Sequence, residues 1–139
     1  MARALLMKEL CCETKDETGL LGRITSAMAI EGVYIIHLSA DKKEGKGVLR
    51  LVTKDNVKAK RAIQYFIPSI QEREVLIVEF ENKVGTLAPV TQLLGSHDIA
   101  IHSVYGTSGD GFKIVGIFAT SNNSEALKLI NEDSGALSV

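Results

Sequence analysis

The sequence has little of several residue types that strongly constrain function. Its 139 residues include no tryptophan, two prolines and two cysteines, and the cysteines, Cys11 and Cys12, are adjacent. On a strand their side chains would point to opposite faces, which does not favour binding of one metal ion. A disulfide framework needs several cysteines spaced along the chain, so none is expected here. We interpret the two thiols as buried and structural.

An excess of one charge and long apolar runs are also missing. The net charge is -1 and aromatic residues make up 5% of the chain, which favours neither a basic surface nor the aromatic strands of an RNA-binding sheet. No apolar run approaches the roughly 20 residues that span a bilayer, and charge interrupts the N-terminus too early for a secretory signal. We expect a cytoplasmic protein that binds neither nucleic acid nor membranes.

Motifs for common enzyme chemistry are not found either. The chain has no G-x-G-x-x-G pattern, no Walker lysine, no Ser-His-Asp or Cys-His arrangement in a sensible context, and no conspicuous pair of carboxylates. We therefore expect no catalytic residue, no metal site and no cofactor. An enzyme whose catalytic groups come together only on folding stays open as an alternative.

What the sequence does contain is an internal repeat. A shift of 66 residues aligns residues 10–56 with residues 76–122 without a gap. The identical pairs are Leu10/Leu76, Glu13/Glu79, Gly19/Gly85, Leu21/Leu87, Thr25/Thr91, Ile35/Ile101, Gly45/Gly111 and Asn56/Asn122. Aliphatic positions, loop glycines and polar loops recur in the same register, which predicts two copies of one unit, as domains 1–70 and 71–139.

Each copy is predicted to form a β-α-β-β-α-β unit of the ferredoxin-like type. The expected strands are residues 5–14, 33–40, 47–53 and 67–73 in the first copy, and 75–80, 99–106, 112–120 and 136–139 in the second. Apolar residues at helical spacing, such as Leu20, Ile24 and Met28, predict a helix after the glycine turn, and a second helix follows the third strand. The fold class is therefore α+β, with two antiparallel sheets joined side by side into about eight strands and helices on one face.

The glycine turn and the strand after the first helix resemble those of the ACT domain, a small regulatory module of amino-acid metabolism. The matching residues are Asp16-Glu17-Thr18-Gly19-Leu20-Leu21 with Gly32-Val33-Tyr34-Ile35, and Asn82-Lys83-Val84-Gly85-Thr86-Leu87 with Asp98-Ile99-Ala100-Ile101. Thr18 and Val84 replace the proline of the family pattern, and Tyr34 and Ala100 replace its strand asparagine. The resemblance covers almost the whole chain twice and implies a stand-alone tandem ACT protein whose copies pair through their second strands.

The resemblance also implies effector sites between the copies, each built from the turn of one copy and the second strand of the other. The expected ligand-binding residues are Asp16, Glu17, Thr18, Gly19, Leu20, Tyr34, Ile35, Ile36, Asn82, Lys83, Val84, Gly85, Thr86, Ala100, Ile101 and His102. Backbone N–H groups at a helix N-terminus can bind a carboxylate, and Asp16 or Asn82 can accept from an ammonium group. The same residues equally suit a tight turn, a helix cap and a solvated lysine.

The function that we expect is non-catalytic regulation, by binding a small effector, an amino acid, and reporting it to a partner enzyme or regulator. The alternatives are an assembly module without a ligand and an unrecognised enzyme of amino-acid metabolism. The strands do not alternate cleanly between apolar and polar residues, and the register opposite the helices includes Leu38, Ile114 and Phe118. An exposed apolar sheet face is unusual in a monomer, so we expect a homodimer or higher oligomer packed through that face.

Overall fold

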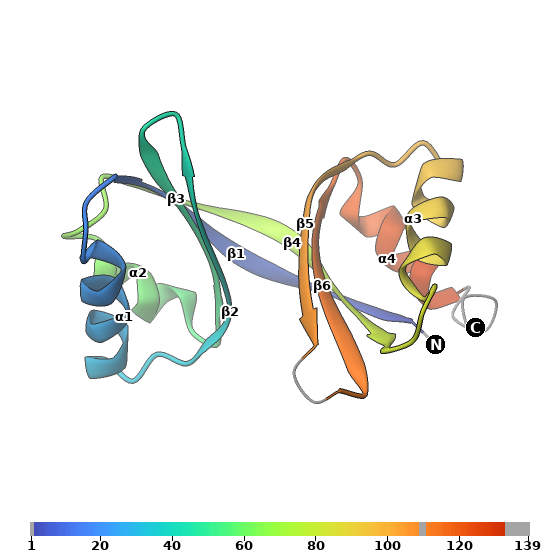
Figure 1. Ribbon diagram of the computed structural model, residues 1–139, viewed down its shortest axis with the longest axis horizontal. Coiled ribbons are helices and arrows are strands. Elements are labelled where there is room, and N and C mark those ends of the chain that lie inside the picture. The colour runs from blue at the N-terminus through green and yellow to red at the C-terminus, as the bar shows by residue number, and fades with distance from the viewer. Residues whose placement is uncertain (1, 109–110, 133–139) are drawn as a thin grey trace. The chain divides into compact units, whose positions relative to one another are not determined.

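The computed structural model describes residues 2–108 and 111–132, which form an α+β fold of strands and helices (Figure 1). The elements are β1 (Arg3–Lys15), α1 (Leu20–Ile30), β2 (Ile35–Lys43), β3 (Lys46–Thr53), α2 (Asn56–Ile63), β4 (Ser69–Glu81), α3 (Leu87–Ser96), β5 (Ile101–Ser108), β6 (Lys113–Thr120) and α4 (Asn123–Glu132). The predicted succession of two βαββα segments is confirmed, and the registered strand pairs are antiparallel.

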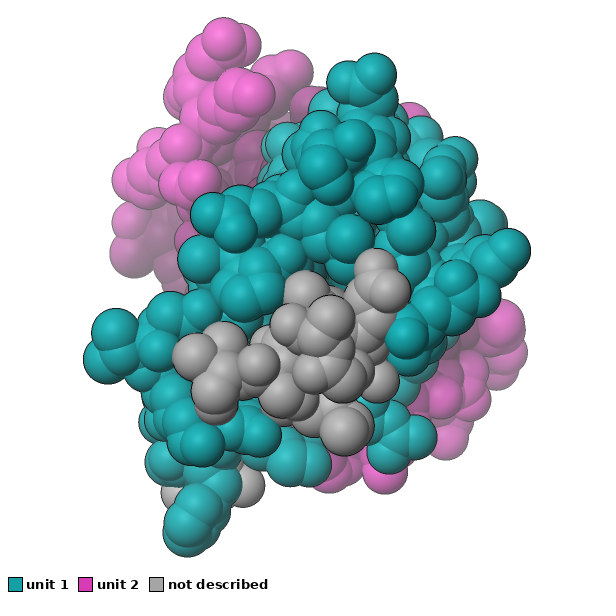
Figure 2. Space-filling model, turned by 90° about the vertical axis from the view of Figure 1, so that its right-hand side faces the viewer, with its two compact units in different colours: residues 1–7, 74–139 teal, residues 8–73 magenta. Residues whose placement is uncertain are grey.

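The chain divides into two compact units, which Figure 2 distinguishes by colour. Unit 2 comprises Lys8–Arg73, and unit 1 comprises Met1–Met7 together with Glu74–Val139. Strands β1 and β4 are each 13 residues long. One part of each strand belongs to unit 1 and the other part to unit 2. The division of the chain into domains 1–70 and 71–139 stays a prediction.

The strands follow the order β2-β3-β1-β4-β6-β5, so each unit uses four strand segments of a six-stranded antiparallel arrangement. We expected eight separate strands, and the structure has six, because both units share β1 and both share β4. Strands β2 and β5 stand at the two ends of the order and do not pair with each other, so the expected pairing through the second strands is wrong.

The N-terminal segment supplies the last strand of unit 1. Ala2 is buried in the core of that unit, and Ala4 and Leu6 pack against the same core. The Asn131 side chain of α4 accepts a hydrogen bond from the Ala4 backbone N–H (2.8 Å) and donates one to the Ala4 carbonyl oxygen (3.0 Å). The closing strand that we expected at residues 136–139 lies outside the described residues.

Each unit has its own apolar core between its helices and one face of its strands. In unit 2, α1 buries Leu20, Ile24 and Met28 at successive turns of one face, as their spacing predicts. The core residues of unit 2 are Leu10, Cys12, Leu20, Ile24, Met28, Val33, Leu49, Leu51, Ala59, Ile63 and Ile67. Those of unit 1 are Ala2, Leu76, Val78, Phe80, Val90, Leu94, Ile99, Phe118, Ala126 and Ile130.

The sequence repeat is not gapless in the structure: the β5–β6 hairpin of unit 1 has one residue more than the β2–β3 hairpin of unit 2. Leu10 pairs with Leu51 in unit 2, whereas Leu76 pairs with Phe118 in unit 1, so the two partners differ by 67 positions rather than 66. The extra residue lies between β5 and β6. A one-residue shift moves a side chain to the other face of a strand, so Phe118 and Ile114 pack against the helices rather than on the open face.

A bulge changes the facing of the second strand in both units. The pairing of β2 with β3 shifts register between Ile35 and His37, and that of β5 with β6 shifts between Ile101 and Ser103. Beyond the bulge Leu38 lies opposite the core residue Leu51, so it shares the helix-covered face. The expectation that Leu38 lies on the open face is therefore wrong.

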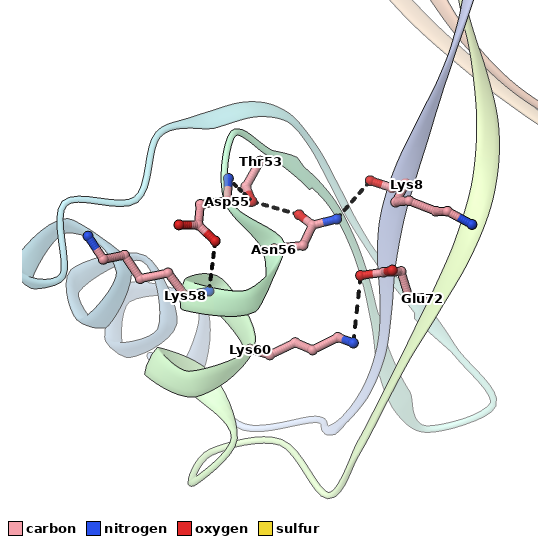
Figure 3. A network of polar contacts seen from close by, with 7 residues as sticks. All are labelled: Lys8, Thr53, Asp55, Asn56, Lys58, Lys60 and Glu72. Atoms are coloured by element: carbon pink, nitrogen blue, oxygen red, sulfur yellow. Dashed lines mark hydrogen bonds and ion pairs between the residues drawn. The ribbon is translucent and has the colours of Figure 1, made fainter.

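The start of α2 shows how the helices are fixed to the strands (Figure 3). The Thr53 hydroxyl donates to Asn56 Oδ1 (2.6 Å), and Asn56 Nδ2 donates to the Lys8 carbonyl oxygen (3.0 Å). The Asp55 carboxylate caps the helix by accepting from the Lys58 backbone N–H (3.1 Å). Unit 1 repeats this arrangement, where Thr120 donates to Asn123 Oδ1 and Asn123 Nδ2 donates to the Glu74 carbonyl oxygen. The structurally equivalent asparagines are therefore Asn56 and Asn123.

Candidate functional site

In unit 2 the predicted glycine turn joins β1 to α1. Gly19 has a φ of 86°, a left-handed conformation that glycine adopts without strain, and it precedes the first helical residue, Leu20. The Arg23 guanidinium binds the Glu17 carboxylate at 2.6 Å, and its hydrogen bond and charge lower the pKa of Glu17. Asp16 Oδ1 lies 3.1 Å from the Lys42 Nζ on β2. Charged groups of both signs therefore meet at this turn.

A hollow of about 450 Å³ lies between this turn and the β2–β3 hairpin of the same unit. Its lining residues are Thr14, Lys15, Asp16, Glu17, Leu20, Leu21, Ile24, Ala40, Asp41, Lys42, Gly47, Val48 and Leu49. Leu20, Ile24 and Leu49 are buried core residues and give the hollow an apolar floor. The charged residues of the turn and of the hairpin form its rim.

Gly47 contributes to the hollow by having no side chain. A Cβ atom at this position would clash with the Oγ1 atom of Thr14, which pairs with Gly47 on β1. Any larger residue at position 47 would therefore push into the space beside the turn. Asp41 and Lys42 at the end of β2 complete the opposite wall.

The equivalent turn of unit 1 is bonded to its own hairpin. The Asn82 backbone N–H donates to the Phe112 carbonyl oxygen, and Asn82 Nδ2 donates to the Gly111 carbonyl oxygen, both at 2.9 Å. The Thr86 hydroxyl is buried and donates to the Glu81 carbonyl oxygen (2.8 Å), while Lys83 binds the Glu81 carboxylate (2.9 Å). The Asn82 side chain thus hydrogen-bonds to the hairpin backbone, whereas Asp16, at the equivalent position of unit 2, forms an ion pair with Lys42.

The remaining predicted residues of the turns and strands differ in exposure. In the turns, Thr18 is exposed, Val84 is 99% exposed, and Gly85 has the same φ of 86° as Gly19. On the strands, Ile35 and Ile101 pack against the two cores, Ile36 is half-buried in the bulge, and Ala100 and His102 are exposed. The Lys54 ammonium lies over the exposed Tyr34 ring, 4.8 Å from its centroid.

The structure thus brings Asp16, Glu17 and Leu20 together in one hollow, while Tyr34, Ile35 and Ile36 do not line it. That the turns and second strands of the two copies build shared sites stays a prediction. The β2–β3 hairpin also lines the hollow, above all with Lys42 and Gly47, which are not among the predicted site residues. The strand order β2-β3-β1 of a split βαβ unit could have predicted this contribution, because it brings the β2–β3 hairpin beside the end of the first strand.

Among residues 2–108 and 111–132, no cluster of three or more His, Cys, Asp or Glu side chains is arranged to hold a metal ion. Within the same part of the chain, no helix combines the length and the apolar character needed to cross a membrane.

Comparison with solved structures identifies proteins of the same architecture. Protein BT0572 from Bacteroides thetaiotaomicron matches with a TM-score of 0.86 and 21% identity, over 94% of this chain and 90% of that protein. The ligand-free regulatory subunit of aspartate kinase from Thermus thermophilus matches with a TM-score of 0.67 and 14% identity, over 93% and 95%. Aspartokinase III of E. coli, in complex with aspartate and ADP, matches with a TM-score of 0.60 and 13% identity, over 94% of this chain and 32% of that protein.

Comparison at the level of sequence finds no relative: no protein-family model matches the chain, and no curated protein matches it. The likeness to solved structures therefore establishes the fold. The chain has the fold of tandem ACT-type units, as its glycine turns and aliphatic spacing predicted.

Proposed function

We propose that this chain is a non-catalytic regulatory protein that binds a small effector, a free amino acid, in the hollow of unit 2. The observation that carries the proposal is the composition of that hollow, which combines an apolar floor with charged groups of both signs at its rim. Ligand sites are typically concave and mostly apolar, with a few polar groups that fix orientation. The likeness in fold to a regulatory subunit of aspartate kinase supports a regulatory role.

The rim suits a zwitterion. The carboxylates of Asp16 and Asp41 can accept from an ammonium group, and Lys42 can pair with a carboxylate. The first backbone N–H groups of a helix have no partners within that helix, and at the start of α1 that of Leu20 donates to the Glu17 carbonyl oxygen. The N–H groups that follow it in the first turn can donate to an anion. The floor formed by Leu20, Ile24 and Leu49 favours an amino acid with an apolar side chain.

Filling the hollow should abolish effector binding. Ala40 is exposed on β2 and lines the hollow, and phenylalanine is well accommodated in strands, so Ala40→Phe should occupy the space with the fold retained. The amino acid that stabilises the wild-type protein in a thermal-shift screen should leave Ala40→Phe unaffected. A ligand at about 100 times its dissociation constant adds roughly 2.7 kcal/mol of stability, which is several degrees for a chain of this size.

The matched control is Thr107→Phe, which places the same side chain at an exposed strand position of unit 1. It should respond to the amino acid as the wild-type protein does. Binding that survives in Ala40→Phe would contradict the hollow as the site. If no amino acid stabilises the wild-type protein, the assembly module is favoured, and turnover of the stabilising compound would favour the enzyme.

The proposal includes a homodimer or higher oligomer that passes the signal to a partner enzyme or regulator. Ile30, Tyr65 and Phe112 are each at least 81% exposed, and apolar surface gains free energy when another chain removes it from water. We expect light scattering at micromolar concentration to give a mass of about twice the 15.0 kDa of one chain or more. A mass near that of a single chain would contradict the oligomer.

A further inference from the structure

A second hollow, of about 350 Å³, lies on unit 2 and differs from the first in composition and in the face of the strands that it occupies. Its lining residues are Cys11, Cys12, Glu13, Lys43, Val48, Arg50, Ser69, Gln71 and Arg73. They come from β1, β2, β3 and β4, so all four strand segments of unit 2 contribute. We call it the sheet-face hollow.

The strand register places this hollow opposite the helices. Cys11 on β1 pairs with Arg50 on β3, and Glu13 pairs with Val48, while the alternate residues Leu10 and Cys12 belong to the core under the helices. Directly opposed residues of an antiparallel pair point to the same face, so Cys11, Glu13, Val48 and Arg50 project away from the helices.

Positive charge dominates the sheet-face hollow. Three cations, Lys43, Arg50 and Arg73, line it against two carboxylates: Glu13 in the lining, whose Oε2 lies 3.9 Å from Lys46 Nζ, and the buried Glu9, which pairs with Arg73. Arg50 is half-buried, and its guanidinium makes no hydrogen bond or ion pair with the residues that the structure describes. A half-buried cation without an internal counter-ion favours an anion from solution.

A buried acid beneath the hollow holds one of the arginines in place. The Glu9 side chain is fully buried, and its Oε1 lies 2.9 Å from Arg73 Nε and 2.8 Å from one terminal nitrogen of the same guanidinium. Pairing with a buried carboxylate fixes the guanidinium plane at the hollow. Burial raises the pKa of the neighbouring Cys11 thiol, so this group stays neutral at pH 7 and does not repel an anion.

We propose that the sheet-face hollow binds a small organic dianion, a compound with a phosphate group or two carboxylates, through Arg50, Lys43 and Arg73. Guanidinium groups bind phosphate and carboxylate in two-point contacts, and Ser69 and Gln71 add neutral donors at the same rim. This site is separate from the amino-acid site on the helix side, and its existence does not depend on that function.

The test measures binding of inorganic phosphate and of succinate to the whole chain by calorimetry, at constant ionic strength with chloride as the reference anion. We expect at least one of the two anions to bind the wild-type protein and to slow alkylation of Cys11, the half-buried thiol of the hollow, whereas Cys12 is only 1% exposed. Replacing Arg50 with glutamine should weaken binding at least about tenfold, because glutamine keeps a neutral donor but loses the charge that pairs with the anion.

The matched control is Arg61→Gln, which makes the same change of charge at an exposed position of α2, on the helix side. It should bind the anion as the wild-type protein does. Binding of phosphate alone or succinate alone supports the site and identifies the headgroup. Wild-type affinity in Arg50→Gln, an equal loss in both variants, or no binding of either anion would overturn the proposal. Arg73 is left unchanged because its substitution would also disturb the buried Glu9.

Discussion

Removing residues 2–6 should unfold unit 1 and leave unit 2 folded. The deletion takes Ala2 out of the core of unit 1, together with the partly buried Ala4 and Leu6, and removes both hydrogen bonds to Asn131. It also leaves the β4 segment of unit 1 without its outer neighbour. A small unit has a stability of only about 5–15 kcal/mol, and losing a whole strand from four consumes most of it.

Hydrogen exchange followed by mass spectrometry separates the two units. Amides of α3 and α4 should exchange at the rate of an unfolded chain after the deletion, while amides of α1 and α2 keep their protection. Leu5→Ala is the matched control, because Leu5 lies in the same segment but is 49% exposed, and it should leave both units protected. Full protection of α3 and α4 in the truncated chain would contradict the prediction, because unit 1 would then fold without residues 2–6.

The Phe118→Ala variant should lose about 4 kcal/mol of stability, near the middle of the range for truncating a buried aromatic side chain. Phe118 is fully buried on the helix-covered face of unit 1, and its ring centroid lies 6.3 Å from that of Phe80. The two rings also cover Gly116, where an added Cβ would lie 2.9 Å from Phe118 and 3.3 Å from Phe80. Truncation therefore opens a cavity over a glycine that has no side chain to fill it.

Denaturant unfolding measures this loss, with Phe112→Ala as the control. Phe112 is 81% exposed, so its truncation should change the free energy of unfolding by less than about 0.5 kcal/mol. Comparable losses in the two variants would contradict the burial of Phe118 under the helices. They would favour the gapless repeat, which places Phe118 on the open face of the sheet.

The sequence was sufficient to predict the local structure of both copies. Gly19 and Gly85 do adopt the same left-handed conformation, and Leu20, Ile24 and Met28 do form the buried face of one helix. Features of this kind depend on residues within one or two turns of each other. Periodicity and glycine positions report such short-range constraints directly.

What could not be predicted depends on pairing between distant strands. Unit 1 has one extra residue before β6, and both units have a bulge, at Ile35 and at Ile101. These features hardly change the amino-acid composition, yet each moves the side chains that follow it to the other face of the strand. For the same reason the candidate site was predicted only in part. Asp16, Glu17 and Leu20 lie in the expected turn, but Lys42 and Gly47 join them through the register of the hairpin.

The order in which the strand segments leave the ribosome differs from the order in which they pair. The segment at Arg3–Met7 is made before unit 2, whereas its partners in unit 1 begin at Glu74, after the whole of unit 2. At roughly 5–20 residues per second, about 4–15 s pass between the synthesis of Met7 and the completion of β4 at Glu81. During that interval an unpaired segment can add to the strand edge of another nascent chain. Fast folding of unit 2 and a low density of nascent chains should therefore favour correct assembly over strand exchange between molecules.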